Sequence, residues 1–91
     1  MTVCLIYEED HGVIGIAKNT DYAIKYLANT NRLNKNTGVK ISMTCGESTE
    51  ESLEEILGEE WIDKLSIYPI NDLNSFFDGI FYFKEMEVFG A

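Results

Sequence analysis

The segment from Glu47 to Leu65 constrains the fold more than any other part of the sequence. Its large apolar residues recur at the spacing of a helix that buries one face. These residues are Leu53, Ile56, Leu57, Trp61 and Leu65. Ser48 and Glu51 have the spacing of a capping box, in which each side chain accepts a hydrogen bond from a backbone N–H group at the helix start. The pattern therefore predicts a helix that begins near Ser48, and we expect Gly58 to end or bend it.

The same segment concentrates acidic residues. Eight carboxylates precede its only base, Lys64: Glu47, Glu50, Glu51, Glu54, Glu55, Glu59, Glu60 and Asp63. Each like-charge pair at i,i+4 on a helix costs about 0.2–0.5 kcal/mol. A straight helix over these residues would carry about one charge per 3 Å along its axis, close to the ~3.4 Å phosphate spacing of one nucleic-acid strand. We therefore predict that these eight residues bind a partner; the alternative is a solvated helix face without a partner.

The net charge of −9 is unevenly distributed along the chain. Residues 1–40 hold five bases and four acids, whereas residues 41–91 hold two bases and twelve acids. Because Lys and Arg supply most of the affinity for phosphates, this charge argues against direct binding to DNA, RNA or an anionic membrane. It leaves open a basic host protein as partner, such as a nuclease or another nucleic-acid-binding protein.

The length and composition predict one folded domain over residues 1–91. The hydrophobic content of 45% is high enough to form a core. We find no apolar run long enough to span a membrane and no signal-peptide pattern. Cys4 and Cys45 are too few for a disulfide framework. These features predict a cytoplasmic protein.

The N-terminal third predicts two strands and a helix. Residues 2–7 are apolar on both faces, which is typical of a central strand. A short polar loop then leads to residues 13–17, so that the two segments form a β-hairpin. Asn19 or Thr20 can cap the helix that follows, and we expect this helix to end near Arg32.

The rest of the chain adds strands at the centre and at the end. Residues 39–43 alternate apolar and polar side chains, as a strand does. We expect an extended segment at 66–70, a short helix capped by Asn71, and a strand over 80–89 whose first half is more buried. The fold class predicted is α+β, a mostly antiparallel sheet of three or four strands with two to three helices packed on it.

Two residues invite a catalytic interpretation, and both lack companions in the sequence. His11 follows Asp10 in the hairpin loop without a Ser or Cys nucleophile nearby, so we interpret it as a solvated turn residue. Cys45 matches no thiol-enzyme motif, and Cys4 is expected to be a small buried residue. The carboxylates lack the order of a calcium loop. The sequence therefore predicts no catalytic residue, no metal site and no cofactor.

Two stretches of the sequence resemble a known group of proteins. They are GVIGIAKNTDYAIKYL, which follows the first strand, and DGIFYFKEMEV near the end. They cover about half of the chain and leave the acidic segment outside. Both resemble small uncharacterised proteins of bacteriophages and prophages in Gram-positive hosts. The resemblance implies a small accessory protein, in a class where inhibitors of host defence are frequent, and it carries over no catalytic residue.

The acidic segment and the resemblance together predict a non-catalytic inhibitor. Its acidic helix would act as a DNA mimic in a basic nucleic-acid-binding groove of a host protein, as an anti-CRISPR or other anti-defence protein would, in the host cytosol. An immunity protein against a basic nuclease would use the same physics. Two other classes stay open. One is a homodimeric structural or assembly protein, and the other is a small-molecule-sequestering protein with a pocket between the last strand and a helix.

Overall fold

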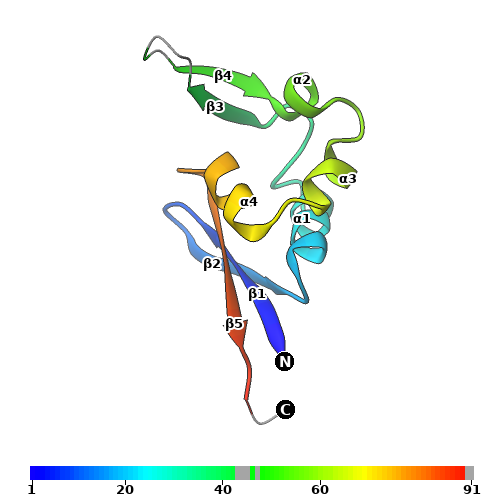
Figure 1. Cartoon of the computed structure of the whole chain (residues 1–91), viewed down its shortest axis with the longest axis vertical. Helices are drawn as coiled ribbons and strands as arrows, with labels where there is room; N and C mark the ends of the chain where they lie inside the picture. Colours follow the sequence, from blue (N-terminus) through cyan, green and yellow to red (C-terminus); the bar gives the residue numbers. More distant parts are fainter. Residues whose placement is uncertain (43–45, 47, 90–91) are drawn as a thin grey trace.

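The computed structural model describes residues 1–42, 46 and 48–89, which form nine elements (Figure 1). Their bounds are β1 Thr2–Glu8, β2 Gly12–Ala17, α1 Thr20–Asn29, β3 Gly38–Ser42, β4 Ser48–Ser52, α2 Leu53–Leu57, α3 Trp61–Ser66, α4 Ile70–Phe76 and β5 Phe81–Glu87. Three strands form an antiparallel sheet in the order β2-β1-β5, and β3 and β4 form a second, two-stranded sheet. The predicted α+β class is confirmed, with four helices in the described part of the chain.

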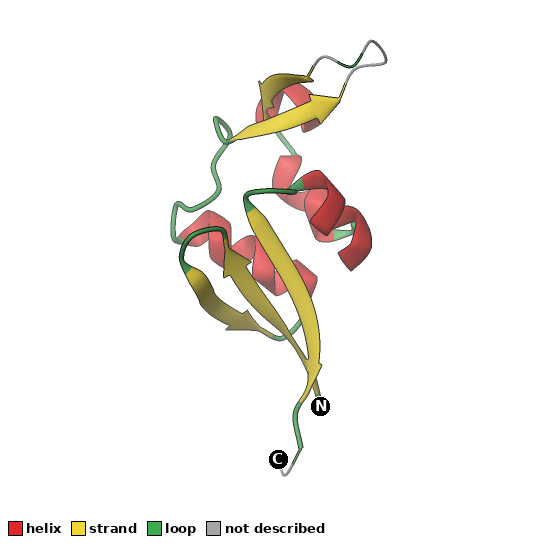
Figure 2. Cartoon of the chain, turned by 90° about the vertical axis from the view of Figure 1, so that its left-hand side faces the viewer, coloured by secondary structure: helices red, strands yellow, loops and turns green. Residues whose placement is uncertain are grey.

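β1 is the central strand of the larger sheet, as its two apolar faces predicted. It forms the expected hairpin with β2 and pairs with β5 along its whole length, from Thr2 opposite Glu87 to Glu8 opposite Phe81. Alternation along β1 directs Cys4 and Ile6 toward the helices, and both are fully buried. Figure 2 looks onto the other face of this sheet, with α1 behind the strands.

One core cluster joins the helices to the larger sheet. Its members include Ile24 of α1, Leu65 of α3 and Leu73 of α4. Phe77, which is fully buried, lies at the centre of the aromatic contacts, with ring centroids 5.9 Å from Phe81 and 6.2 Å from Phe83. Large aromatic side chains therefore supply much of the interior of this small domain.

Helix α1 begins where the sequence predicted and ends earlier. The Asn19 side chain accepts a hydrogen bond from the Tyr22 N–H group, which identifies Asn19 as the N-cap. The helix ends at Asn29 and not near Arg32. Asn31 has a positive φ of 59°, a conformation that Asn tolerates and that a helix cannot continue through.

The predicted acidic helix is wrong over residues 48–52, which form strand β4. β4 pairs antiparallel with β3, and Glu51 lies opposite the buried Val39. Residues 48–52 contain only Ser, Thr and Glu, so a helix there would have no apolar face to bury. The strand also avoids the i,i+4 repulsion that a helix would impose between Glu50 and Glu54. Residues 48–52 are therefore more stable as a strand paired with β3 than as part of a helix.

Helix α2 starts at the second of two consecutive Ser-x-x-Glu motifs, not at the predicted Ser48. The Ser52 hydroxyl accepts from the Glu55 N–H group at 3.2 Å, and the Glu55 carboxylate accepts from the Ser52 N–H group at 3.2 Å. This motif directly precedes the buried Leu53, which gives the helix its apolar face. Gly58 has a φ of 84° and ends α2, as predicted.

The predicted extended segment at 66–70 is also wrong. α3 runs through Ser66, and α4 already begins at Ile70. The N-cap of α4 is Pro69 and not the predicted Asn71. Proline suits a helix start because it has no N–H group to leave unpaired there.

The last strand, β5, is shorter than the predicted range of 80–89. It follows a turn at Gly79, which has a φ of 81°. Phe81 and Phe83 are buried, whereas Tyr82 and Met86 point to the other face and are about half exposed. The prediction that the first half of the strand is more buried is therefore confirmed.

Candidate acidic interface

The structure distributes the predicted acidic residues over β4, α2, the turn before α3, and α3. Seven of the eight are described: Glu50 and Glu51 on β4, Glu54 and Glu55 on α2, Glu59 and Glu60 in the turn, and Asp63 on α3. The eighth, Glu47, lies outside the described residues. We call these seven residues the acidic surface. All are exposed except Glu51, which is half-buried.

The two acids of β4 point in opposite directions, because side chains alternate along a strand. Glu51 lies on the same face as its buried partner Val39. Glu50 lies on the other face, where its carboxylate occupies the space above Gly38 that a β-carbon would take. The acidic surface is therefore not the single line of charges that a straight helix would present, and its charges are spread over three elements.

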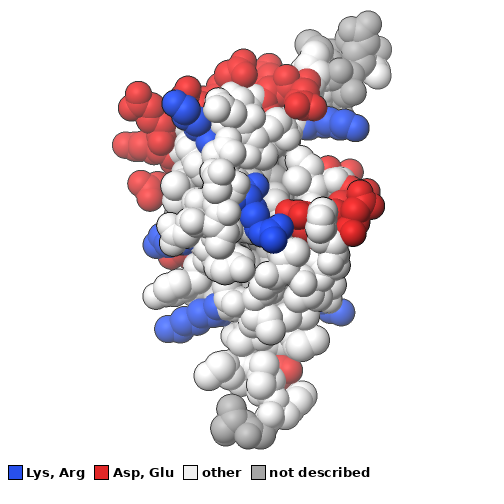
Figure 3. Space-filling model, turned by 180° about the vertical axis from the view of Figure 1, so that it is seen from behind, with Lys and Arg blue, Asp and Glu red and all other residues white. Residues whose placement is uncertain are grey.

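Within the described residues, no ion pair neutralises a carboxylate of the acidic surface. Lys64, the nearest base in sequence, donates its Nζ hydrogen bond to the Leu57 carbonyl at 2.6 Å. By contrast, Glu8 pairs with Arg32 at 3.0 Å, and Asp21 pairs with Lys25 at 3.2 Å. Figure 3 shows carboxylates gathered over the upper half of the molecule, whereas the lower half is mainly uncharged. Among the described residues, no Lys or Arg side chain therefore lies within ion-pair distance of these carboxylates, although Lys40 is the cross-strand neighbour of Glu50.

A hollow of about 360 Å³ lies beside the acidic surface, between the β3–β4 hairpin and the larger sheet. Glu50, Glu9 and Asp78 line it, together with Lys40. Glu9 and Asp78 were not predicted to belong to this region, because they lie in turns far apart in the chain. β1 and β5 bring them together: the Glu9 N–H group donates to the Ile80 carbonyl at 3.0 Å. This pairing of the first and last strands has no local signal in the sequence that could have identified Glu9 and Asp78.

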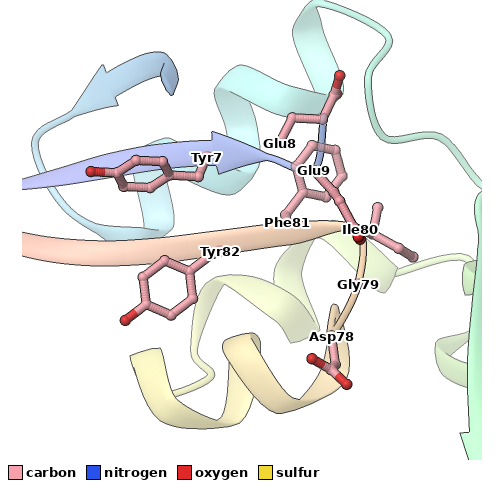
Figure 4. A pocket seen from close by; sticks show the side chains of 8 residues that line it. All are labelled: Tyr7, Glu8, Glu9, Asp78, Gly79, Ile80, Phe81 and Tyr82. Carbon is pink, nitrogen blue, oxygen red and sulfur yellow. The ribbon is translucent and has the colours of Figure 1, made fainter. Parts of the chain in front are cut away.

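A second hollow of about 340 Å³ adjoins the first and shares Glu9 and Asp78 with it (Figure 4). Tyr7 and Tyr82 form its aromatic side, with ring centroids 6.0 Å apart. Strand ends and a turn line this hollow, and Tyr82 is half exposed. It therefore differs from the pocket between the last strand and a helix that the sequence analysis kept as an alternative.

The residues considered for catalysis lie apart from the acidic surface. His11 is exposed in the β1–β2 turn, with its Nδ1 atom 2.9 Å from a carboxylate oxygen of Glu8, as expected for a solvated turn residue. Cys4 is buried, which confirms its predicted role as a small core residue. Burial, and to a smaller extent the charge of Glu85, raises the pKa of the Cys4 thiol and keeps it protonated. Cys45 lies outside the described residues.

Comparisons of this chain with protein-family models, with curated proteins and with solved structures find no match. Among the described residues, no three His, Cys, Asp or Glu side chains gather closely enough to hold a metal ion. The helices between residues 1 and 89 that the structure describes are all too short or too polar to cross a bilayer. The acidic surface is therefore the feature on which a functional hypothesis can be built.

Proposed function

We propose that this protein is a non-catalytic binding protein whose acidic surface binds a basic surface of a partner protein. The observation that carries the proposal is the lack of any ion pair to these seven carboxylates within the described part of the chain. A surface under no other demand usually mixes positive and negative side chains. Unneutralised like charges repel one another, and a basic partner would relieve that repulsion.

The kind of partner follows from the charge and the exposure of these side chains. A basic nucleic-acid-binding groove offers the densest positive surface that proteins commonly present. The protein would then inhibit a nucleic-acid-handling host protein as a DNA mimic, with an anti-defence or immunity role. A mimic built in this way presents a patch of carboxylates from a strand, a turn and two helices. It does not present a straight rod.

The proposal can be tested with matched charge variants. The site variant replaces Glu54, Glu59 and Glu60 by Gln, because all three are exposed and Glu55 is kept for its capping role. The control variant carries the same change in net charge at exposed residues that do not belong to the acidic surface. Its substitutions are Asp10→Asn, Asp72→Asn and Glu85→Gln. Each protein is immobilised, incubated with a host-cell extract at low and raised salt, and the retained proteins are identified by mass spectrometry.

We expect the wild type and the control variant to retain one or more nucleic-acid-binding proteins. The site variant should bind about 3- to 150-fold more weakly, because each exposed ion pair contributes about 0.2–1 kcal/mol. Raised salt should weaken binding of the wild type. The purified partner should release labelled DNA when the protein is added. Equal loss in both variants, or binding that ignores salt, would contradict a role for the acidic surface. Binding without release of DNA would contradict DNA mimicry but not the role of the acidic surface in binding the partner.

A further inference from the structure

One face of the larger sheet carries apolar side chains that no described helix covers. By the strand registers, this face is opposite the one that carries Cys4 and Ile6. We call it the outer sheet face; its residues are Val3, Leu5, Tyr7, Val13, Ile16, Tyr82, Lys84 and Met86. Ile16 is 66% exposed and Val13 52%. In Figure 2 this face is turned toward the viewer, and α1 lies behind it.

The composition of the outer sheet face is typical of a covered surface. An antiparallel sheet with one face in water usually alternates apolar residues inside with polar residues outside. Here Lys84 is the only charged side chain among the eight residues. The central strand shows the same feature in the sequence, since residues 2–7 are apolar on both faces. The helices cover one apolar face of β1. On the other face Leu5 is only 7% exposed between its partners Ile16 and Lys84, and the exposed apolar side chains belong to the flanking strands β2 and β5: Val13, Ile16, Tyr82 and Met86 are 43–66% exposed.

The distribution of charge favours a second copy of this chain as the occupant. The chain carries a net charge of −9, yet the outer sheet face carries no carboxylate. Strands β3 and β4 and helix α2 lie at the opposite end of the molecule from the start of β1 and the end of β5 (Figure 1). Two copies that meet on this face with their long axes antiparallel therefore keep their acidic surfaces apart. A basic partner, which recognises charge, finds no carboxylate on this face.

We infer that two copies of this chain associate through their outer sheet faces, sheet against sheet, as a weak homodimer. A two-fold dimer uses the same patch on both copies, and an apolar sheet face is self-complementary in this way. Three strands of about seven residues cover roughly 300 Å² in projection. Standard interfaces bury about 800 Å² per partner, so the dimer is concentration-dependent. It involves a different surface from the proposed function and is independent of it.

The test is sedimentation velocity over protein concentrations from about 10 μM to about 1 mM, the range of a weak association. The site variant is Ile16→Lys, at the most exposed apolar residue of the outer sheet face. The matched control is Ile67→Lys, because Ile67 is 82% exposed at the end of α3 and away from the sheet. Thermal unfolding verifies that both variants fold, as substitutions at such exposed positions should allow.

We expect the mean mass of the wild type and of Ile67→Lys to rise toward that of a dimer as the protein concentration increases. Ile16→Lys should stay monomeric, with its dissociation constant raised at least tenfold. Added salt should strengthen the dimer by screening repulsion between the two acidic chains, the opposite of its effect on partner binding. A wild type that stays monomeric at the highest concentration would overturn the inference. Equal association of wild type and Ile16→Lys, or equal loss in both variants, would also overturn it.

Discussion

The side chain of Asn74 binds the free edge of β5. Its Nδ2 atom donates to the Phe83 carbonyl at 2.9 Å, and the Phe83 N–H group donates to its Oδ1 atom at 2.7 Å. In an antiparallel pair, the backbone N–H and C=O groups of successive residues point alternately toward and away from the neighbouring strand. The groups of Phe83 point away from β1 and toward Asn74. Asn74 thus makes the two hydrogen bonds that a further strand would make. Asn74→Ala should leave both Phe83 groups without their partner.

The cost can be estimated from this geometry. Each hydrogen bond contributes about 0.5–1.5 kcal/mol, and a buried group left unpaired costs about 1–3 kcal/mol. Because the two bonds are half-buried, we expect Asn74→Ala to lower the free energy of unfolding by about 2–4 kcal/mol. That is a large share of the ~5–14 kcal/mol typical of a chain of this length. The melting temperature should fall by about 8–30 °C.

Urea unfolding followed by circular dichroism measures this difference. Asn71→Ala is the matched control, because Asn71 is exposed on the same helix, and its free energy of unfolding should change by less than about 0.5 kcal/mol. Asn74→Asp removes the donor and keeps the acceptor, so it separates the two bonds. If Asn74→Ala is within about 0.5 kcal/mol of Asn71→Ala, water replaces the side chain and the edge of β5 needs no protection.

Three further predictions concern stability. Ser52→Ala should cost about 0.5–2 kcal/mol in urea unfolding by removing the cap that Glu55 shares, whereas Ser52→Asp should retain it. Gly15→Ala would place a β-carbon 2.9 Å from the Tyr26 ring; it should cost about 1–3 kcal/mol, and less when Tyr26→Ala is also present. The pKa of Cys4 is raised above 9.0 in the folded state. The stability due to the protonated thiol is therefore complete below the unfolded-state pKa and is lost as the pH rises through the folded-state pKa, so Cys4→Ala should flatten the alkaline decline.

Local signals in the sequence predicted the features that depend on neighbouring residues. The Asn19 cap, the stop at Gly58 and the β1–β2 hairpin each depend on side chains or turn conformations within a few positions. The predicted start of the acidic helix is wrong because the capping-box rule fits both of two consecutive Ser-x-x-Glu motifs, and only the second directly precedes an apolar residue, Leu53. The choice was made by β3, which offers the segment 48–52 a pairing partner.

For the candidate acidic interface too, some features could be predicted from the sequence and others depend on the fold. The acidic character of residues 50–63, which include no base, can be read from the composition alone, because charge does not depend on the fold. The opposite directions of Glu50 and Glu51, and the hollow that Glu9 and Asp78 line together with Glu50, are set by the tertiary structure. These arrangements depend on strand pairing between segments that are distant in the chain, and long-range pairing leaves no local mark in the order of the residues.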